Sequence, residues 1–286
     1  MREGAVTTAL LRAALPLLIA GRVLAGVLGA PEARAAEAES ATELAKKTQN
    51  PVADLISVPL QSNFNFGSGT KEETVYILNV QPVVPIKLTT DWNLITRTIV
   101  PIINQPSLFP GPGRISESAF GLGDINPSLF LSPAKPGAII WGVGPTFTFP
   151  TATDSQLGSE KFSAGPAAVA LTIQGPWVFG VLVSQQWSFA GWGDQDVSQM
   201  VIQPFVNYNI GDGWYLSSVP LITADWEASS GNKWTVPVGG GVGKLFRVGK
   251  LPINTQLQAF SNVEKPDFGP DWQLRFQIQF LLPGFK

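Results

Sequence analysis

The end of the sequence, WQLRFQIQFLLPGFK at residues 272–286, alternates strictly between apolar and polar side chains from Trp272 to Phe280. A period of two predicts a β-strand with one apolar and one polar face. In a soluble sheet the apolar face packs on a core. In a membrane barrel it meets lipid, and the polar face lines a lumen. The apolar positions are Trp272, Leu274, Phe276, Ile278, Phe280 and Leu282, and the polar ones are Gln273, Arg275, Gln277 and Gln279.

The composition excludes several classes of function. Charged residues are 14% of the 286-residue chain, against about 25% in typical soluble domains. A net charge of −2 argues against a nucleic-acid partner. The chain has no cysteine and no histidine, which removes disulfides, thiolate chemistry, serine–histidine catalysis and the commonest metal ligands. We therefore expect no enzymatic activity and no metal or other cofactor.

Residues 1–35 have the features of a signal peptide. Arg2 and Arg12 lie near its start, an apolar stretch runs from Ala13 to Ala30, and small residues precede position 36. The alternative is a transmembrane helix, but Arg22 interrupts the apolar stretch. The sequence thus predicts an exported protein with a polar N-terminal periplasmic segment, helical or disordered, at 36–57.

Strand-like runs fill the chain from residue 58 to the C-terminus. Most are longer than the roughly 5–6 residues typical of globular proteins and match the roughly 9–11 residues that cross a bilayer at a tilt. Long and short connections alternate, as in outer-membrane barrels and unlike a Greek-key sandwich such as a secreted lectin. We predict an all-β fold: an up-and-down antiparallel transmembrane barrel of about 12 strands at 58–286. The strands are expected near 58–66, 74–88, 92–103, 121–132, 139–151, 163–174, 177–189, 197–210, 214–227, 234–247, 253–263 and 271–282.

The nine tryptophans fall at the predicted strand ends. Indole rings favour the headgroup level of a bilayer, so two aromatic belts are expected of a spanning barrel. The apolar face of the last strand then meets lipid, in the outer membrane of a Gram-negative-type bacterium. Trp92, Trp141, Trp177 and Trp214 fall at the periplasmic end, and Trp187, Trp192, Trp226, Trp234 and Trp272 at the extracellular end.

Prolines interrupt most of the predicted strands. Proline cannot donate to a β-ladder and is usually confined to edges and bulges, but a closed barrel has no edges. We interpret these prolines as repeated bulges or bends that curve the wall. They are Pro59, Pro82, Pro85, Pro101, Pro127, Pro145, Pro166, Pro204, Pro220 and Pro237.

Five segments carry a resemblance to a known family: ELAKKTQNPVADLISVPLQSNFNFGSG (43–69), GLGDINPSLFLSP (121–133), NYNIGDGWYL (207–216), WTVPVGGGVGK (234–244) and GPDWQLRFQIQFLLP (269–283). Together they resemble the bacterial outer-membrane "transporter" family of the meta-pathway of phenol degradation, some members of which are mislabelled neuromedin U. The resemblance implies a barrel that helps small, often aromatic or hydrophobic, compounds cross the outer membrane. It supplies no substrate-binding residues.

Alternation places mostly amide side chains in the lumen. Amides hydrogen-bond neutral solutes with little preference for charge, whereas rings of charge select ions by sign. We expect an outer-membrane channel or uptake protein for passive passage of small uncharged, aromatic or hydrophobic solutes. The alternative is a non-conducting structural or surface-interaction barrel whose amides satisfy one another. The candidate lumen-lining residues are Gln61, Asn63, Asn79, Gln81, Arg97, Gln186, Gln199, Gln203, Asn207, Gln256, Gln258, Arg275, Gln277 and Gln279.

Two segments are candidates for closing the lumen. Residues 36–57 are the natural candidate for a periplasmic plug, and the long connection Asn104–Phe120 could instead fold inward as a constriction. The expected partners are outer-membrane lipid, an unidentified small solute and, during biogenesis, the outer-membrane insertion machinery. The last strand resembles the terminal signal which that machinery reads, but it ends in Pro283–Lys286 rather than at a phenylalanine. The oligomeric state is left open.

Overall fold

The computed structural model of the protein describes residues 41–110 and 117–282. The predicted signal peptide, residues 1–35, lies outside the described residues. Within the described part, residues 41–48 are helical, and no helix is long and apolar enough to cross a membrane.

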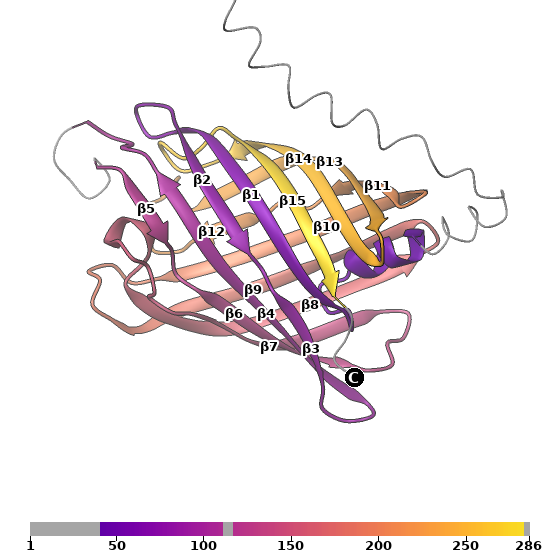
Figure 1. Ribbon diagram of the computed structural model, residues 1–286. Coiled ribbons are helices and arrows are strands. Elements are labelled where there is room, and N and C mark those ends of the chain that lie inside the picture. The colour runs from indigo at the N-terminus through magenta and orange to yellow at the C-terminus, as the bar shows by residue number, and fades with distance from the viewer. Residues whose placement is uncertain (1–40, 111–116, 283–286) are drawn as a thin grey trace, which may run out of the picture. The chain divides into compact units, whose positions relative to one another are not determined.

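Fifteen strands of the described chain form one antiparallel sheet (Figure 1). Three pairs of short strands, β2 with β3, β5 with β6 and β11 with β12, continue each other across a brief interruption, so that twelve barrel strands result. The strands are β1 (Ile56–Ser68), β2 (Glu73–Val80), β3 (Val83–Lys87), β4 (Trp92–Gln105), β5 (Ala119–Leu122), β6 (Asn126–Pro133), β7 (Ile140–Thr148), β8 (Lys161–Gln174), β9 (Trp177–Gly191), β10 (Ser198–Gly211), β11 (Trp214–Ser218), β12 (Ile222–Asp225), β13 (Trp234–Val248), β14 (Leu251–Glu264) and β15 (Trp272–Leu282). A 3-10 turn, Ser155–Leu157, lies between β7 and β8.

The sheet closes on itself. Consecutive members of the twelve barrel strands pair with each other, and β1 pairs with β15 in continuous register from Ile56 opposite Leu282 to Phe66 opposite Trp272. The predicted up-and-down barrel of twelve strands is therefore confirmed, and each predicted range falls on one barrel strand. Three of the ranges predicted as continuous strands, 74–88, 121–132 and 214–227, contain the interruptions.

Along β15 the outer face of the barrel is apolar and the inner face is polar. Trp272 and Phe276 are about two-fifths exposed on the outer surface, whereas Arg275 is 5% and Gln279 7% exposed. A soluble sheet would bury the apolar set instead. This inside-out arrangement is that of an outer-membrane barrel, whose outer surface meets lipid.

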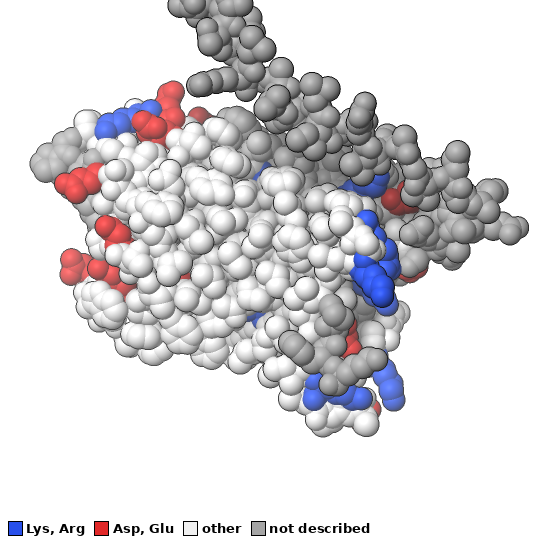
Figure 2. All heavy atoms as spheres, viewed as in Figure 1, with Lys and Arg blue, Asp and Glu red and all other residues white. Residues whose placement is uncertain are grey.

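The tryptophans form two belts. Trp92, Trp177 and Trp214 open β4, β9 and β11 at one end of the barrel, while Trp234 and Trp272 open β13 and β15 at the other. Neighbouring rings in each belt touch: the centroids of Trp92 and Trp141 are 6.0 Å apart, and those of Trp226 and Trp234 are 5.5 Å apart. Figure 2 shows the charged side chains gathered at the two ends of the barrel, acidic ones predominating at the end with the long loops and basic ones at the opposite end, with a largely uncharged band between.

The connections differ in length between the two ends. At one end, β8–β9, β10–β11 and β13–β14 are joined by the two-residue turns 175–176, 212–213 and 249–250, whereas 106–118 and 149–160 are long links at the other end. Because short turns of outer-membrane barrels face the periplasm and long loops face the exterior, we name the two ends periplasmic and extracellular. Asp212 and Gly213 both have positive φ, 50° and 75°, as a type I′ hairpin turn requires. The first two connections, 69–72 and 88–91, are equally short because β1 continues to Ser68.

The prolines do not act alike. Pro82 and Pro220 lie in the gaps between β2 and β3 and between β11 and β12, and a register shift occurs at Pro237. Our interpretation of the prolines as bulges and bends holds at these positions. It is wrong for others, since Pro145 and Pro166 face each other in unbroken register. Because a strand residue offers its N–H to only one neighbour, a proline there costs a single ladder bond.

Candidate functional site

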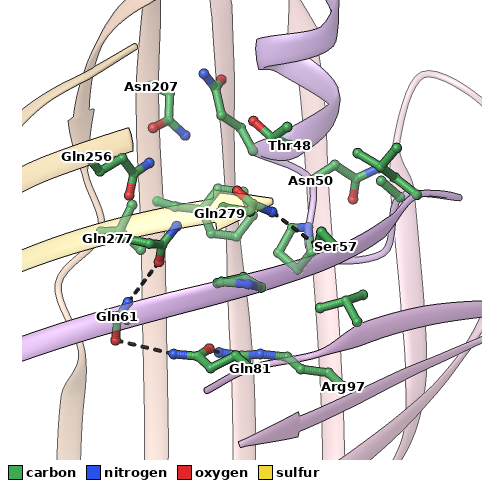
Figure 3. A pocket seen from close by; sticks show the side chains of 18 of the residues that line it. Thr48, Asn50, Ser57, Gln61, Gln81, Arg97, Asn207, Gln256, Gln277 and Gln279 are labelled. Atoms are coloured by element: carbon green, nitrogen blue, oxygen red, sulfur yellow. Dashed lines mark hydrogen bonds between the residues drawn. The ribbon is translucent and has the colours of Figure 1, made fainter. Parts of the chain in front are cut away.

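The lumen contains two chambers. The inner chamber, about 140 Å³, lies at the periplasmic end beneath an N-terminal segment (residues 41–55) and is lined by Asn207, Gln256, Gln258, Gln277 and Gln279 among others (Figure 3). The outer chamber, about 270 Å³, lies toward the long loops and is lined by Asn79, Asp124, Phe130, Leu182, Gln186 and Gln199 among others.

Five side chains line both chambers, so they form a neck between them. They are Gln61, Gln81, Arg97, Gln203 and Arg275. Four come from β1, β4, β10 and β15, and Gln81 comes from the interruption between β2 and β3. A solute that crosses the lumen through these chambers passes two guanidinium groups and three amides at this point.

Arg97 begins a directional chain of hydrogen bonds across the neck. Its Nη2 donates to Oε1 of Gln81 at 2.8 Å, Nε2 of Gln81 donates to Oε1 of Gln61 at 3.3 Å, and Nε2 of Gln61 donates to Oε1 of Gln277 at 3.1 Å (Figure 3). Each amide turns its oxygen toward the cation and its N–H groups away. The bonds therefore polarise one another in the same sense, and the charge of Arg97 is held by neutral groups.

Arg275 is also held by neutral acceptors. Its Nε donates to Oδ1 of Asn63 at 3.2 Å, Nη1 to the carbonyl of Val219 at 2.7 Å and Nη2 to Oε1 of Gln273 at 2.9 Å. The guanidinium carbon lies 4.9 Å from the ring centroid of Phe260. Val219 belongs to the gap between β11 and β12, so Arg275 bridges β15 to a part of the wall with which it is not paired in the sheet.

The strand interruptions supply polar groups to the interior. Pro220 has no N–H for the neighbouring strand, and in that gap the carbonyl of Val219 is free to accept from Arg275. At the gap before Pro82, Gln81 accepts from Arg97. In the third gap the carboxylate of Asp124 accepts from the backbone N–H groups of Ala152 and Ser159 and from the Ser159 hydroxyl, which fastens the 149–160 loop.

One side of the lumen is apolar, which the sequence did not predict. We define the apolar wall by its buried residues on β4, β6, β8, β9 and β10. Alternation could not reveal it, because β8 reads KFSAGPAAVALTIQ and is apolar on both faces. The lumen is consequently amphipathic, with this wall facing the amides of β1, β14 and β15. The apolar wall consists of Ile95, Phe130, Ala167, Val169, Leu171, Val178, Leu182 and Phe205.

The inner chamber is bordered by a second hydrogen-bond chain. The hydroxyl of Tyr215 donates to Asn254 at 2.7 Å, Asn254 donates to Gln279 at 3.1 Å, and Gln279 donates to Ser57 at 3.1 Å. Two residues that line this chamber each carry a buried carbonyl oxygen with no partner among the described residues, Oδ1 of Asn207 and Oε1 of Gln258.

The N-terminal segment docks on the periplasmic end of the barrel. Ala45 is fully buried and packs with Tyr215, Leu245 and Leu281. Gln49 and Asn209 exchange two hydrogen bonds, 3.0 Å and 3.2 Å long. Val52 packs against the apolar wall. The segment thus covers the inner chamber from the side of the short turns.

The loop predicted as an alternative constriction, Asn104–Phe120, is described only in part, because residues 111–116 lie outside the description. In its described part, the carbonyl of Leu108 accepts from the backbone of Lys71, and the ring of Phe109 meets that of Phe268 edge-on at 5.4 Å. These contacts tie the loop to its extracellular neighbours.

The candidate lumen residues are distributed between the two chambers. Asn63 lines neither chamber and instead accepts from Arg275. Gln61, Gln81, Arg97, Gln203 and Arg275 form the neck; Asn207, Gln256, Gln258, Gln277 and Gln279 line the inner chamber; Asn79, Gln186 and Gln199 line the outer chamber.

In the part of the chain that the structure describes, no group of three or more acidic side chains could hold a metal ion.

Comparison with known proteins supports the fold. No protein-family model matches the chain, and no curated protein matches it significantly. The crystal structure of the COG4313 outer membrane channel from Pseudomonas putida F1 aligns at a TM-score of 0.56 and 16% identity, over 80% of this chain and 94% of that chain. Outer membrane phospholipase A from Escherichia coli aligns at a TM-score of 0.42 and 14% identity, over 85% of this chain and 98% of that chain. The first likeness shows a common outer-membrane barrel fold, and the second is too weak to bear on function.

Proposed function

We propose that the protein is an outer-membrane channel through which small uncharged solutes with an apolar or aromatic body pass by diffusion. The observation that carries this proposal is the amphipathic lumen, whose two chambers meet at a neck. Amides on one side hydrogen-bond polar groups, while Phe130, Leu182 and Phe205 on the other contact apolar ones. Several weak sites in series suit conduction, since a solute must enter readily and also leave.

The N-terminal segment is the proposed gate of this channel. It is fastened by the buried Ala45 and Val52 and by the amide pair of Gln49 and Asn209. Undocking would open the inner chamber to the periplasm and leave the pairing of β1 with β15 intact. The predicted plug at 36–57 overlaps this segment from residue 41 onward; residues 36–40 lie outside the described residues, and β1 already begins at Ile56.

Two further considerations support transport over catalysis. The COG4313 protein that shares the fold is an outer membrane channel by name, and this chain lacks the histidine that a serine–histidine mechanism needs. The family resemblance in the sequence favours aromatic or hydrophobic compounds as the solutes. We infer no enzymatic activity.

A non-conducting barrel is the second candidate. The hydrogen bonds that join Arg97, Gln81, Gln61 and Gln277 favour it, because amides that satisfy one another can simply fill a narrow lumen. Such a protein would act as a structural or surface-interaction barrel.

Single-channel conductance in a planar bilayer distinguishes the two candidates. The chain has no cysteine, so cysteines introduced at Gln49 and Asn209 form a unique pair that a short bismaleimide can link. We expect discrete conductance steps from the unlinked double variant and silence after linking. Equal conductance from both forms would refute the gate. Silence from both forms of a barrel whose gel mobility still changes on heating would favour the non-conducting candidate.

A further inference from the structure

We propose that the neck is a binding site for one carboxylate group carried on an apolar body, held between Arg97 and Arg275. The inference goes beyond the proposed function, because it adds a monoanionic substrate class to the uncharged solutes. Its consequence for transport rests on that function, whereas the binding itself does not.

The charges around the neck are unbalanced. Neither Arg97 nor Arg275 forms an ion pair with a described residue. Among the described residues that line the chambers, Asp124 is the one acid, and its carboxylate already accepts three hydrogen bonds from the 149–160 loop. A cation held away from bulk water without a counter-ion is unfavourable. The neck therefore favours a solute that brings a negative charge.

The two guanidinium groups keep donors for such a solute. A guanidinium has five N–H donors in a planar fork that matches a carboxylate. Arg97 donates one hydrogen bond to a described residue and Arg275 donates three. The remaining N–H groups belong to side chains that line both chambers.

The groups that hold the two arginines are neutral, and this allows an anionic solute to bind reversibly. Gln81, which is 5% exposed, holds Arg97 through its carbonyl oxygen. A glutamate at this position would hold the guanidinium equally well, but it would neutralise the charge and compete with an incoming anion. An amide fixes the side chain in place and leaves its charge available.

The opposite wall selects for the apolar body. The outer chamber joins the neck and is also lined by Phe130, Leu182, Val201 and Leu221. An inorganic anion would gain nothing from these side chains, whereas an aromatic or short aliphatic monocarboxylate would place its body against them and its carboxylate in the neck.

Binding of benzoate to the folded protein in detergent micelles, measured by isothermal titration calorimetry, tests this inference. Benzamide is the neutral probe of the same shape, and inorganic phosphate is the anion without an apolar body. We expect benzoate to bind about tenfold or more tightly than either, since hydrogen bonds to a charged group are at stake. Equal binding of benzoate and benzamide, or tighter binding of phosphate, would overturn the proposal.

Two variants locate the site. Arg97→Gln should weaken benzoate binding about tenfold or more and leave benzamide binding unchanged. Gln81→Glu keeps the side-chain shape and Arg97 itself, so it provides the same test should Arg97→Gln fail to fold, and it should cause the same loss. Lys250→Gln, which removes an exposed cation from the turn between β13 and β14, is the control and should change nothing.

An equal loss of benzoate binding in Lys250→Gln, or full retention in Gln81→Glu, would contradict the proposal. This binding assay measures no transport. Benzoate binding to a barrel that proves non-conducting would therefore refute the channel function and support the binding site. A conducting barrel without benzoate binding would do the reverse.

Discussion

Replacing Gln49 by alanine should release the N-terminal segment while leaving the barrel wall intact. The substitution removes both hydrogen bonds of the pair with Asn209, 3.0 Å and 3.2 Å long. Each is buried and contributes about 0.5–1.5 kcal/mol net, so docking should weaken by about 1–3 kcal/mol. Asn209 keeps its bond to the carbonyl of Pro176 at 2.9 Å, so the barrel side of the contact remains ordered. The undocked population should rise about 5- to 150-fold.

Thiol labelling at position 45 measures this population. Ala45, on the segment itself, is fully buried against the barrel, and an Ala45→Cys variant carries the chain's single thiol because the natural sequence has no cysteine. When docking and undocking are fast relative to modification, the labelling rate follows the undocked population. Adding Gln49→Ala to Ala45→Cys should therefore accelerate maleimide labelling by the same factor.

The matched control is Glu43→Ala on the same segment. Glu43 is exposed and makes an ion pair with Lys46 at 2.8 Å, and such a helix pair contributes about 0.2–0.5 kcal/mol. Its loss should change the labelling rate by about twofold or less. A Gln49→Ala rate within that same twofold range would refute the argument that the amide pair holds the segment. Rapid labelling of Ala45→Cys alone would show that the segment is undocked in solution.

Three other substitutions test the barrel itself. Tyr215→Phe removes the hydroxyl that donates to Asn254 at 2.7 Å and should lower the free energy of unfolding in urea by about 1–3 kcal/mol, whereas Tyr208→Phe on the outer surface should change it by less than about 0.5 kcal/mol. Gly243→Ala would drive a methyl group into the ring of Tyr215, so the heat-modifiable form on gels should be lost, while Gly137→Ala in an open turn should retain it. Phe276→Arg at mid-strand on the lipid face should destabilise the barrel in vesicles by about 2–4 kcal/mol and Leu282→Arg at the strand end by about 0–1 kcal/mol; equal costs would contradict the assigned membrane depth.

The fold could be predicted from the sequence because lipid imposes its pattern residue by residue. Strict alternation in β15 depends only on which face meets the bilayer, and Trp92, Trp214 and Trp234 mark strand ends because indole prefers the headgroup level. These are local signals. Each can be read without knowing which strands are neighbours.

The interior could be predicted only where it is polar. Alternation predicted the amides of β1, β14 and β15, but it could not predict the apolar wall, because Ala167 and Val169 are flanked by outward residues that are also apolar. The contact of Arg275 with Val219 could not be predicted from the sequence for a different reason. It joins parts of the wall that are not paired in the sheet, and no pattern within one strand encodes such a contact.

Two of the prolines directly follow residues that bind the arginines of the neck. At two of the three strand interruptions a proline removes a ladder donor, and the residue before it engages an arginine: Gln81 before Pro82 accepts from Arg97, and Val219 before Pro220 accepts from Arg275. An unbroken ladder would use the carbonyl of Val219 between strands. The interruption at Pro220 thus frees a backbone acceptor for Arg275, while Gln81 holds Arg97 through its side-chain amide. Both acceptors are neutral, which is the condition that the neck needs to keep its charge available to a solute.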